Sequence, residues 1–390
     1  MNRDNSPTMI RTCHVAPGQR AHHTRIYHRF CWSLSRSGYA VDLLAHPDKE
    51  TTNGAITLTS LGESIESTLK WRLLSRLLRN IRAYRYALKL NSHLYIFYSP
   101  EFIPWALLLK LHTAKPIVFD CMEDFESYVR LRPGIPDWLR GTLALLVRLT
   151  LRFAAKHLDA ITVADPATEA YFHRYADRIV TIYNFPRLEL FPPRKLNQVA
   201  PRDFDLVYHG HIALYYLELI LAIDEYLVAS GRPVTWYLFG TTDEPCWFKS
   251  ELSRRKSLDR FHMGGLISHD RVASEVRRAR IGIIPLPNVP KFHSNIPQKL
   301  FEFMALGLPV ILSDLPPSRP FVADKSVGIL VEPNPKAYAQ AIIRLLDDTA
   351  LCDTMGREGR RRVESTYNWA HESQKLLTLA KTLVRRNNCS

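Results

Sequence analysis

The sequence predicts an α/β protein built from two parallel sheets, each covered by helices, in successive halves of the chain. Short β-rich runs alternate with longer helical patterns, which is typical of βαβ units. Many of these runs are apolar throughout, as strands buried on both faces are. The alternation pauses once, near the middle of the 390 residues, and then resumes.

Each half contains six candidate strands. In the first half they are residues 9–14, 40–45, 94–98, 116–120, 160–164 and 179–183. In the second half they are residues 205–209, 235–239, 260–263, 281–285, 310–313 and 328–331. We therefore expect a first domain over 1–185, a proline-rich and charged linker over 186–202 and a second domain over 203–365. A C-terminal helix over 366–390 can pack back on the first domain.

Composition and charge narrow the function classes. The 52 Lys and Arg residues exceed the 38 Asp and Glu residues by 14, so an anionic partner is expected: nucleic acid, a membrane surface or a phosphorylated substrate. No recognisable nucleic-acid motif supports the first option. No apolar run reaches the roughly 18 residues of a membrane span, and the start lacks a signal-peptide core. Six scattered cysteines without a CxxC pair indicate a reducing cytoplasm and no zinc motif.

The densest motif lies at residues 292–314, FHSNIPQKLFEFMALGLPVILSD. Pro297 suits the first turn of a helix, and Gly307 suits the left-handed residue that ends one. Free N–H groups at this helix start favour a phosphate, and Lys299 adds positive charge to them. Glu302, one turn further on, can accept hydrogen bonds from a ribose diol. The alternative is a capped surface helix with ordinary charges.

Other candidates follow predicted strands, at the edge where open α/β sheets bind ligands. Gly210 and His211 follow the first strand of the second half, and His211 is a candidate for donor phosphate. Glu123 and Asp124 follow a strand of the first half and can orient an acceptor hydroxyl. Gly18 would allow a phosphate or acceptor to approach closely. For each of them an ordinary loop residue is the alternative.

Several segments together resemble family 4 glycosyltransferases. Residues 292–314 resemble the nucleotide-sugar-binding region of that family. Further likenesses lie at residues 260–267 (RFHMGGLI), 279–286 (ARIGIIPL), 355–372 (MGREGRRRVESTYNWAHE), 25–29 (RIYHR), 34–41 (LSRSGYAV), 118–124 (VFDCMED) and 180–186 (VTIYNFP). The resemblance covers nearly the whole chain. It implies the GT-B fold, in which two Rossmann-like domains face a central cleft.

The sequence departs from the family pattern at three places. The family often carries two glutamates eight positions apart; Glu302 matches the second, but Ser294 stands at the first. Basic residues usually follow the first strand of the second domain, whereas Tyr216 stands near one of those positions. Met122 replaces a histidine that often follows the aspartate matched by Asp120. These departures leave the transfer of catalytic roles open.

The resemblance implies a retaining, metal-independent transferase that uses a nucleotide sugar and a glycan or lipid-linked acceptor, as in surface polysaccharide or glycoconjugate biosynthesis. No cofactor is implied beyond the nucleotide-sugar co-substrate. The implied catalytic residues are Glu123, Asp124 and Lys299. The implied donor site comprises Gly210, His211, Gly265, Leu266, Ser294, Asn295, Ile296, Lys299 and Glu302. Gly18 and Arg25 are implied for an acceptor or phosphate loop.

Residues 68–91 predict a basic amphipathic helix, a type that can lie on an anionic membrane. Its seven basic residues are not interrupted by an acid. The apolar face expected at helical spacing consists of Leu73, Leu77, Ile81, Tyr84 and Leu88. The residues expected at the membrane are Arg72, Arg76, Arg79 and Arg82. The alternative is a helix packed on its own sheet with a solvated basic face.

Three rival functions remain open. A sugar-nucleotide epimerase would share the fold, and a non-catalytic partner of a transferase would explain the three departures. A nucleic-acid binder is suggested by charge alone. The pair Asp203 and Asp205 forms a DxD motif, which in another transferase fold binds a metal, but it stands at the entrance of a strand.

Overall fold

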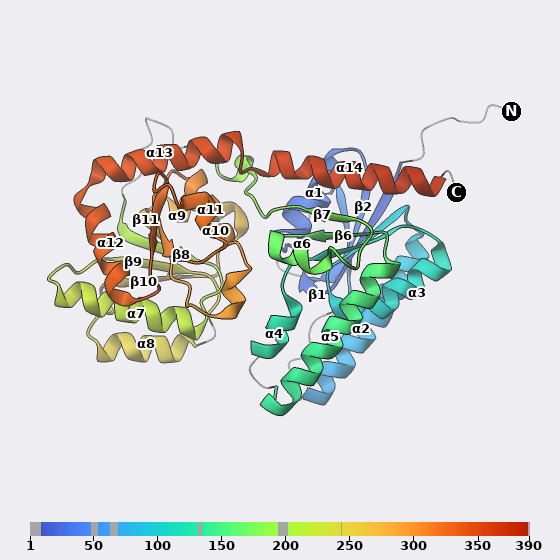
Figure 1. Ribbon diagram of the computed structural model, residues 1–390, viewed down its shortest axis with the longest axis horizontal. Coiled ribbons are helices and arrows are strands. Elements are labelled where there is room, and N and C mark those ends of the chain that lie inside the picture. The colour runs from blue at the N-terminus through green and yellow to red at the C-terminus, as the bar shows by residue number, and fades with distance from the viewer. Residues whose placement is uncertain are drawn as a thin grey trace. The chain divides into compact units, whose positions relative to one another are not determined.

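The computed structural model of the protein describes residues 9–47, 54–62, 69–131, 135–193, 202–242 and 244–388. The chain divides into two compact units (Figure 1). Unit 1 comprises Met1–Asn184 together with Ala370–Ser390, and unit 2 comprises Phe185–Trp369. Each unit is a parallel sheet with helices on both faces, so the predicted α/β class with two Rossmann-like domains is confirmed.

Unit 1 has a seven-stranded sheet in the order β3-β2-β1-β4-β5-β6-β7. Its strands are β1 (Arg11–Arg20), β2 (Ala40–His46), β3 (Ile56–Ser60), β4 (Leu94–Phe97), β5 (Ile117–Cys121), β6 (Ala160–Val163) and β7 (Ile179–Thr181). Its helices are η1 (Ile26–Cys31), α1 (Trp32–Arg36), α2 (Leu69–Leu90), η2 (Pro100–Phe102), α3 (Ile103–Thr113), α4 (Phe125–Leu131), α5 (Asp137–His157), α6 (Pro166–Phe172) and most of α14 (Trp369–Asn388).

Unit 2 has a six-stranded sheet in the order β10-β9-β8-β11-β12-β13. Its strands are β8 (Phe204–His209), β9 (Trp236–Phe239), β10 (Phe261–Gly265), β11 (Ala279–Ile284), β12 (Val310–Ser313) and β13 (Gly328–Val331). Its helices are η3 (Leu188–Leu190), α7 (Leu214–Ala229), α8 (Pro245–Arg254), η4 (His269–Arg271), α9 (Val272–Val276), η5 (Pro290–His293), α10 (Gln298–Ala305), α11 (Arg319–Val322), α12 (Pro335–Asp347) and α13 (Thr349–Ser365).

All registered strand pairs of both sheets are parallel. The strands therefore end at a common edge in each unit, and that edge is where the candidate residues must be sought. The strands predicted from the sequence lie within about two residues of their expected bounds, except that β1 continues to Arg20, well beyond its expected end at residue 14. The edge strand β3 was not predicted. Within the described ranges, no helix combines the length and apolarity needed to cross a membrane.

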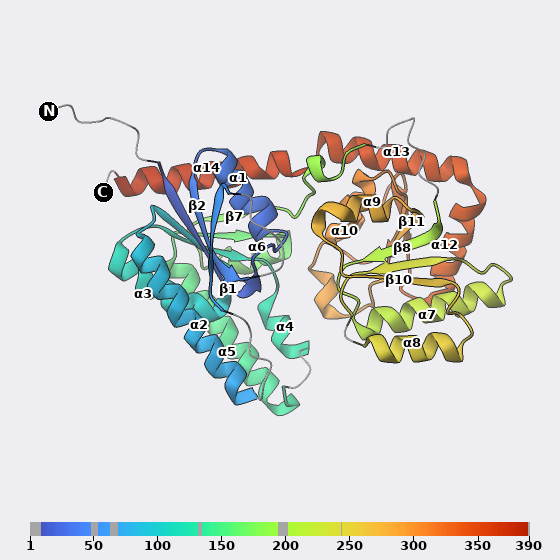
Figure 2. The same ribbon diagram turned by 180° about the vertical axis from the view of Figure 1, so that it is seen from behind.

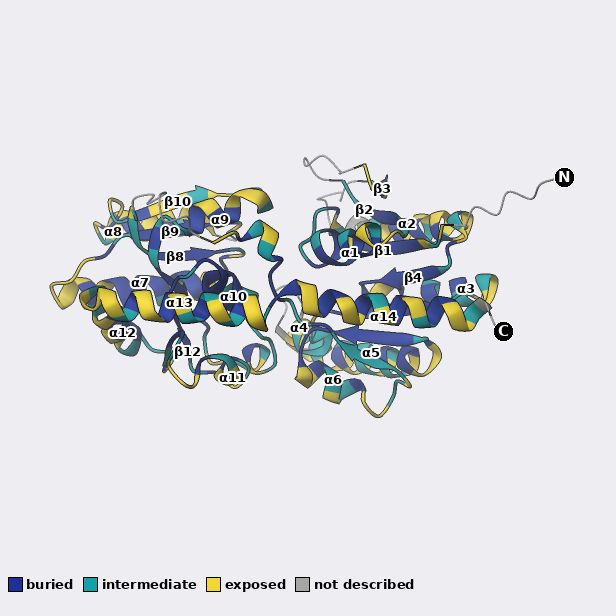
Figure 3. Ribbon diagram, turned by 90° about the horizontal axis from the view of Figure 1, so that it is seen from above, coloured by how far each residue is buried: buried dark blue, intermediate teal, exposed yellow. Residues whose placement is uncertain are grey.

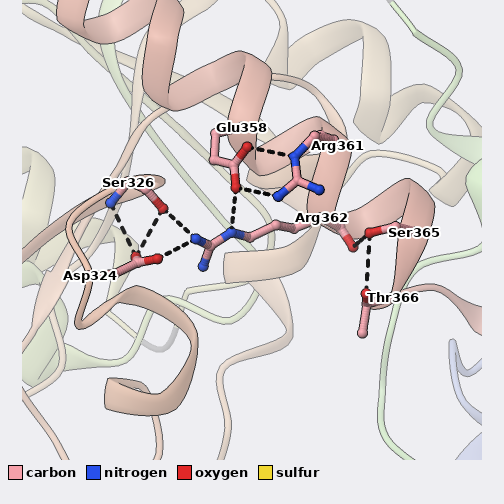
Figure 4. A network of polar contacts seen from close by, with 7 residues as sticks. All are labelled: Asp324, Ser326, Glu358, Arg361, Arg362, Ser365 and Thr366. Carbon is pink, nitrogen blue, oxygen red and sulfur yellow. Dashed lines mark hydrogen bonds and ion pairs between the residues drawn. The ribbon is translucent and has the colours of Figure 1, made fainter.

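The arginine-rich segment of α13 holds this helix to unit 2 (Figure 4). Arg362 bonds Asp324 and Ser326, which lie just before β13, and its Nε donates to Glu358 at 2.8 Å. Arg360 donates to the carbonyl of Ala305, at the end of α10, at 2.6 Å. These arginines therefore serve as structural ties for the helix that packs behind α10.

Arg25 lies in the interior of unit 1 and not in an acceptor-binding loop, which corrects the expectation for this residue. It is 2% exposed. Its Nε and Nη2 donate to the two carboxylate oxygens of Asp120, both at 2.8 Å, and its Nη1 donates to the carbonyl of Ile182 and to Asn184 Oδ1. A guanidinium that is 2% exposed and spends four of its five N–H donors on groups of its own unit is a structural tie rather than a substrate contact.

The predicted basic helix is present as α2, but a different face is buried. Ala83 and Ala87 are fully buried, and Arg79 is only 8% exposed, whereas Leu77 and Leu88 are exposed. The expectation that Arg79 contacts a membrane is therefore wrong. Arg82 remains on the surface, while Arg76 is half-buried; the side chain of Arg72 lies outside the described residues. Figure 3 shows the exposed residues along the outer side of α2.

Candidate functional site

Helix α10 begins and ends as its sequence predicts. Pro297 is the N-cap residue, and Gly307 takes the left-handed conformation beyond the last turn, with φ at +69°. One face of the helix is buried, with Leu300 and Phe303 at 0% exposure. Gly282 of β11 leaves the room for Phe303, because a Cβ at this glycine would lie 2.4 Å from the ring. This packing fixes the rotation of α10 and so the directions of Lys299 and Glu302.

Two glycines with positive φ bring the ends of neighbouring strands into close backbone contact. Gly210, after β8, has φ at +106°, and Gly240, after β9, has φ at +129°. A Cβ on Gly240 would lie 1.9 Å from the carbonyl oxygen of Gly210, and the Gly240 N–H donates to the carbonyl of Gly265 at 2.7 Å. Only glycine fits such an approach. The ends of β8, β9 and β10 thus form a floor of bare backbone.

Lys299 lies directly over this floor. A Cβ on Gly210 would stand 2.9 Å from Lys299 Cε and 3.1 Å from its Nζ. The ammonium also lies 5.1 Å from the centre of the Tyr208 ring, within cation–π range. Within the part of the chain that the structure describes, Lys299 has no carboxylate partner. Its charge is thus held in place by apolar and backbone atoms and stays available to an anion.

Glu302 is buried behind Lys299. It is 3% exposed, and Gln298 donates to its Oε1. Its Oε2 lies 3.2 Å from His209 Nε2, but the angle does not make a hydrogen bond. Burial, together with a smaller effect of Lys299, lowers the pKa of His209 to about 3. The imidazole is therefore neutral, and it stacks on Phe239 with ring centres 5.3 Å apart. Each Glu302 oxygen keeps a lone pair for a further donor.

The other predicted donor residues surround this centre less closely. Ser294, Asn295 and Ile296 form the half-buried segment between η5 and α10. Leu266 is 69% exposed beyond β10, and His211 is exposed beside Thr241, with 3.2 Å between Nδ1 and Oγ1. The structure thus brings Gly210, Gly265, Lys299 and Glu302 to one edge of unit 2. Tyr216 is buried against Tyr208 and cannot replace a basic residue.

The candidates of unit 1 lie at the carboxyl edge of its own sheet. Asp124 is occupied as the cap of α4, where its Oδ1 accepts from the Ser127 N–H at 3.0 Å, while Glu123 is exposed just after β5. Gly18 is exposed near the end of β1, where a Cβ would lie 3.3 Å from Ser99 Oγ. Glu123 and Gly18 are accessible, whereas Asp124 already has a structural role.

Sequence reasoning missed three residues of the unit 2 site: His209, Gly240 and Gln298. Gln298 stands four residues before Glu302, a helical spacing that predicts contact. Gly240 follows a buried strand, as Gly210 does, and this parallel could have identified it. His209 directly precedes Gly210, but nothing in the sequence marks it as the buried neighbour of Glu302.

The DxD pair of the sequence forms ion pairs with two arginines of β11 and its approach. Asp203 Oδ2 accepts from Arg278 Nε at 2.9 Å. Asp205 Oδ1 lies 3.5 Å from Arg280 Nη1, and its Oδ2 accepts from Thr235. Both carboxylates stand at the amino ends of strands, at the edge of the sheet opposite to Lys299.

Comparison with known proteins agrees with this geometry. Residues 204–348 match the family model described as glycosyl transferases group 1. An 81-residue stretch, 20% of this chain, is 31% identical to the spore coat protein SA of Bacillus subtilis and spans 22% of that protein.

Solved structures of similar fold cover almost the whole chain. Sucrose-phosphate synthase from Thermosynechococcus elongatus has a TM-score of 0.75 and 21% identity, over 97% of this chain and 100% of that one. The Anabaena protein HepE in complex with UDP and glucose has a TM-score of 0.68 and 12% identity, over 96% and 100%. The resemblance to glycosyltransferases predicted from the sequence is thus confirmed, together with the GT-B fold, and residues 204–348 are similar to the group 1 glycosyl transferases.

Proposed function

We propose that the protein is a glycosyltransferase that moves a hexose from a nucleotide sugar to a glycan or lipid-linked acceptor. The observation that carries this proposal is Lys299 on its glycine floor, with Glu302 buried one turn behind it. An uncompensated ammonium at a helix start suits the diphosphate of the donor, and a buried carboxylate with spare lone pairs suits the ribose hydroxyls. The group 1 match over residues 204–348 supports the same assignment.

The remaining donor contacts follow from the positions of the neighbouring residues. Ser294, Asn295 and Ile296 precede α10 and line the sugar, whereas Gly265 and Leu266 lie beyond the floor, toward the base. His211 adds a polar contact to phosphate. In unit 1, the exposed Glu123 orients the acceptor hydroxyl.

We further propose a retaining reaction without a metal. Lys299 and the N–H groups of α10 stabilise the charge that develops on the leaving diphosphate. The leaving phosphate takes the proton of the acceptor hydroxyl on the same face of the sugar, so the protein supplies positioning and charge rather than a nucleophile. The DxD carboxylates support metal independence, because Arg278 and Arg280 already pair with them.

We also propose that the enzyme works in the cytoplasm at the inner face of a membrane, in surface polysaccharide or glycoconjugate synthesis. Exposed leucines and arginines share the outer side of α2. The leucines Leu74, Leu77 and Leu78 are 42–51% exposed, and Arg82 and Arg85 are exposed beside them. Such a surface fits anionic lipid through both charge and apolar contact.

A panel of labelled nucleotide sugars tests the reaction. We expect slow hydrolysis or transfer with one donor, retention at the anomeric carbon, and unchanged activity in excess chelator. Inversion of a sugar centre without transfer would instead identify an epimerase. Donor binding without any turnover would identify a non-catalytic partner subunit. Loss of activity with chelator, restored by magnesium or manganese, would refute the metal-independent mechanism.

A further inference from the structure

Arg79 is a buried cation of unit 1 that forms no ion pair with any residue that the structure describes. It is 8% exposed, and its Nε and Nη1 find no hydrogen-bond partner among the residues that the structure describes. Buried polar groups are normally paired, because a group that has left water without a new partner destabilises the fold. A guanidinium with two buried nitrogens that lack a hydrogen-bond partner therefore indicates an acceptor from a ligand.

The surroundings of Arg79 locate it at the carboxyl edge of the sheet. His46 is the last residue of β2; burial lowers its pKa, and Arg79 contributes to the lowering. Burial lowers the pKa of Arg79, and Glu101, which follows β4, opposes this by raising it. Since β1 lies between β2 and β4 in the sheet, Arg79 stands beside the end of β1.

The end of β1 is kept open by Gly18. A Cβ at this position would lie 3.3 Å from Ser99 Oγ and 3.9 Å from Glu101 Oε2. Gly18 is exposed, so the surface between the ends of β1 and β4 is reachable from solvent. The hydroxyl of Ser99, which is 5% exposed, lies beside this surface and can donate a further hydrogen bond.

The charge balance at this edge favours an anion. The acid known to act on Arg79 is Glu101, whose Oε1 lies 3.3 Å from Arg76 Nη1. Arg76 thus offsets the charge of Glu101, and among the residues that the structure describes no other acid pairs with Arg79. Arg82 is not a candidate for the same anion, because its Nη1 already donates to the carbonyl of Leu61 at 2.9 Å.

We propose that Arg79 is the centre of an oxyanion site, and that its ligand is the phosphate group of a phosphorylated acceptor. A guanidinium carries charged N–H donors, and phosphate oxygens accept strong, charge-assisted hydrogen bonds from them. The assignment of the ligand to the acceptor rests on the proposed transferase function, whereas the anion site itself does not. The same phosphate chemistry is offered by a soluble sugar phosphate and by the headgroup of a lipid phosphate.

Binding measurements on the full chain test the site. Wild type, Arg79→Gln and Arg174→Gln are titrated with hexose phosphate, inorganic phosphate and the matching neutral hexose. Arg174 is exposed in the same unit and controls for the loss of one charge. We expect wild type and Arg174→Gln to prefer hexose phosphate over hexose. Arg79→Gln should bind hexose phosphate about tenfold to a hundredfold more weakly, as for a lost charged hydrogen bond.

A second arm distinguishes the two sources of phosphate. Phosphatidylcholine vesicles are prepared with and without a polyprenyl phosphate, and protein binding is measured by sedimentation. Binding that requires both the polyprenyl phosphate and Arg79 assigns the lipid headgroup. Binding of hexose phosphate that requires Arg79 assigns a soluble acceptor.

Thermal stability separates a binding role from a structural one. If Arg79 awaits a ligand, Arg79→Met removes an unsatisfied charge, and the variant without phosphate should melt at the same temperature as wild type or higher. Phosphate should then raise the Tm of wild type more than that of the variant, which keeps only the anion site around Lys299. If Arg79→Met does not fold, Arg79→Lys, which keeps the charge but not the fork, should show an intermediate loss of hexose phosphate binding.

Two results would overturn the proposal: no phosphate ligand binding to wild type in either arm, or equal binding by wild type and Arg79→Gln. UDP binding is measured in parallel, because the donor residues belong to unit 2. Intact UDP binding and turnover without phosphate binding would remove the Arg79 site and leave the transferase function standing. Phosphate binding through Arg79 without any sugar transfer would refute the transferase function and leave the site.

Discussion

Helices α10 and α2 each bury a charged residue near the carboxyl edge of a parallel sheet, but the two charged residues differ in how many of their polar atoms have partners. In unit 2, Glu302 is buried among groups that support it: Gln298 donates to one oxygen, and His209 packs beside the other. In unit 1, Arg79 is buried, and its Nε and Nη1 have no hydrogen-bond partner among the described residues. The first arrangement resembles a site built before the ligand arrives, and the second a site that its ligand completes.

The difference follows from the residues with which each helix packs on its unit. The buried face of α10 carries large apolar residues, so its rotation is fixed by packing alone. The buried face of α2 carries Ala83 and Ala87, which let the helix approach its neighbours closely but leave little apolar contact to hold a charge in place. The comparison predicts that disturbing unit 2 affects donor binding, whereas disturbing unit 1 affects acceptor binding or stability.

The largest expected effect concerns the buried ion pair of unit 1, which is satisfied where Arg79 is not. Asp120→Ala leaves Arg25 buried without its carboxylate and should lower the free energy of unfolding by about 3–5 kcal/mol. Urea unfolding measures this. Asp137→Ala removes an acid whose side chain is 89% exposed and paired with Arg140; as a surface control it should cost at most about 1 kcal/mol. Similar losses in both variants would contradict the distinction.

The next effect concerns the donor. Glu302→Ala should weaken nucleotide-sugar binding by about 1.5–3 kcal/mol, or roughly tenfold to a hundredfold, because the ribose hydroxyls lose a charged acceptor. Calorimetry with the donor found in the panel measures this. Asp347→Ala, an exposed acid of the same unit, is the control and should bind normally. Unchanged affinity in a folded Glu302→Ala protein would exclude the ribose contact.

The sequence predicts the structure of helix α10 better than that of helix α2. The bounds of α10 were predictable because Pro297 and Gly307 have conformational preferences that act locally. The buried face of α2 was not predictable from the sequence, because its leucines form the stronger apolar stripe. It is tertiary packing that buries the face with the alanines instead. Strand β3 was missed because it is short and lies at the sheet edge, with only Ile56 buried. The support of Glu302 by His209 joins distant segments, which no local pattern records.

Acid should reveal the buried histidine of the donor site. The pKa of His209 is depressed to about 3 by burial and by Lys299, so below its ordinary value near 6.5 the unfolded chain takes up a proton that the folded chain refuses. Stability is therefore complete above pH 6.5 and falls as the pH drops toward 3, by up to about 1.4 kcal/mol per unit for this group. His209→Asn should flatten this slope in urea midpoints measured between pH 4 and 7, while His14, whose pKa burial also lowers to about 3, retains its share. An unchanged slope would show that His209 is protonated in the folded protein or exposed to water.

The smallest effect concerns the outer side of α2, and it separates the surface arginines from Arg79. Arg82 and Arg85 are exposed, and each contributes about 1 kcal/mol to binding if it lies near an anionic surface. Arg82→Gln with Arg85→Gln should therefore weaken sedimentation with phosphatidylglycerol vesicles, most clearly at low salt, where screening is least. Removing two exposed arginines of unit 2, with Arg254→Gln and Arg361→Gln, gives the same change in net charge and should leave vesicle binding intact. If both double variants lose binding equally, net charge rather than α2 attracts the lipid, and the exposed leucines of that helix need another partner.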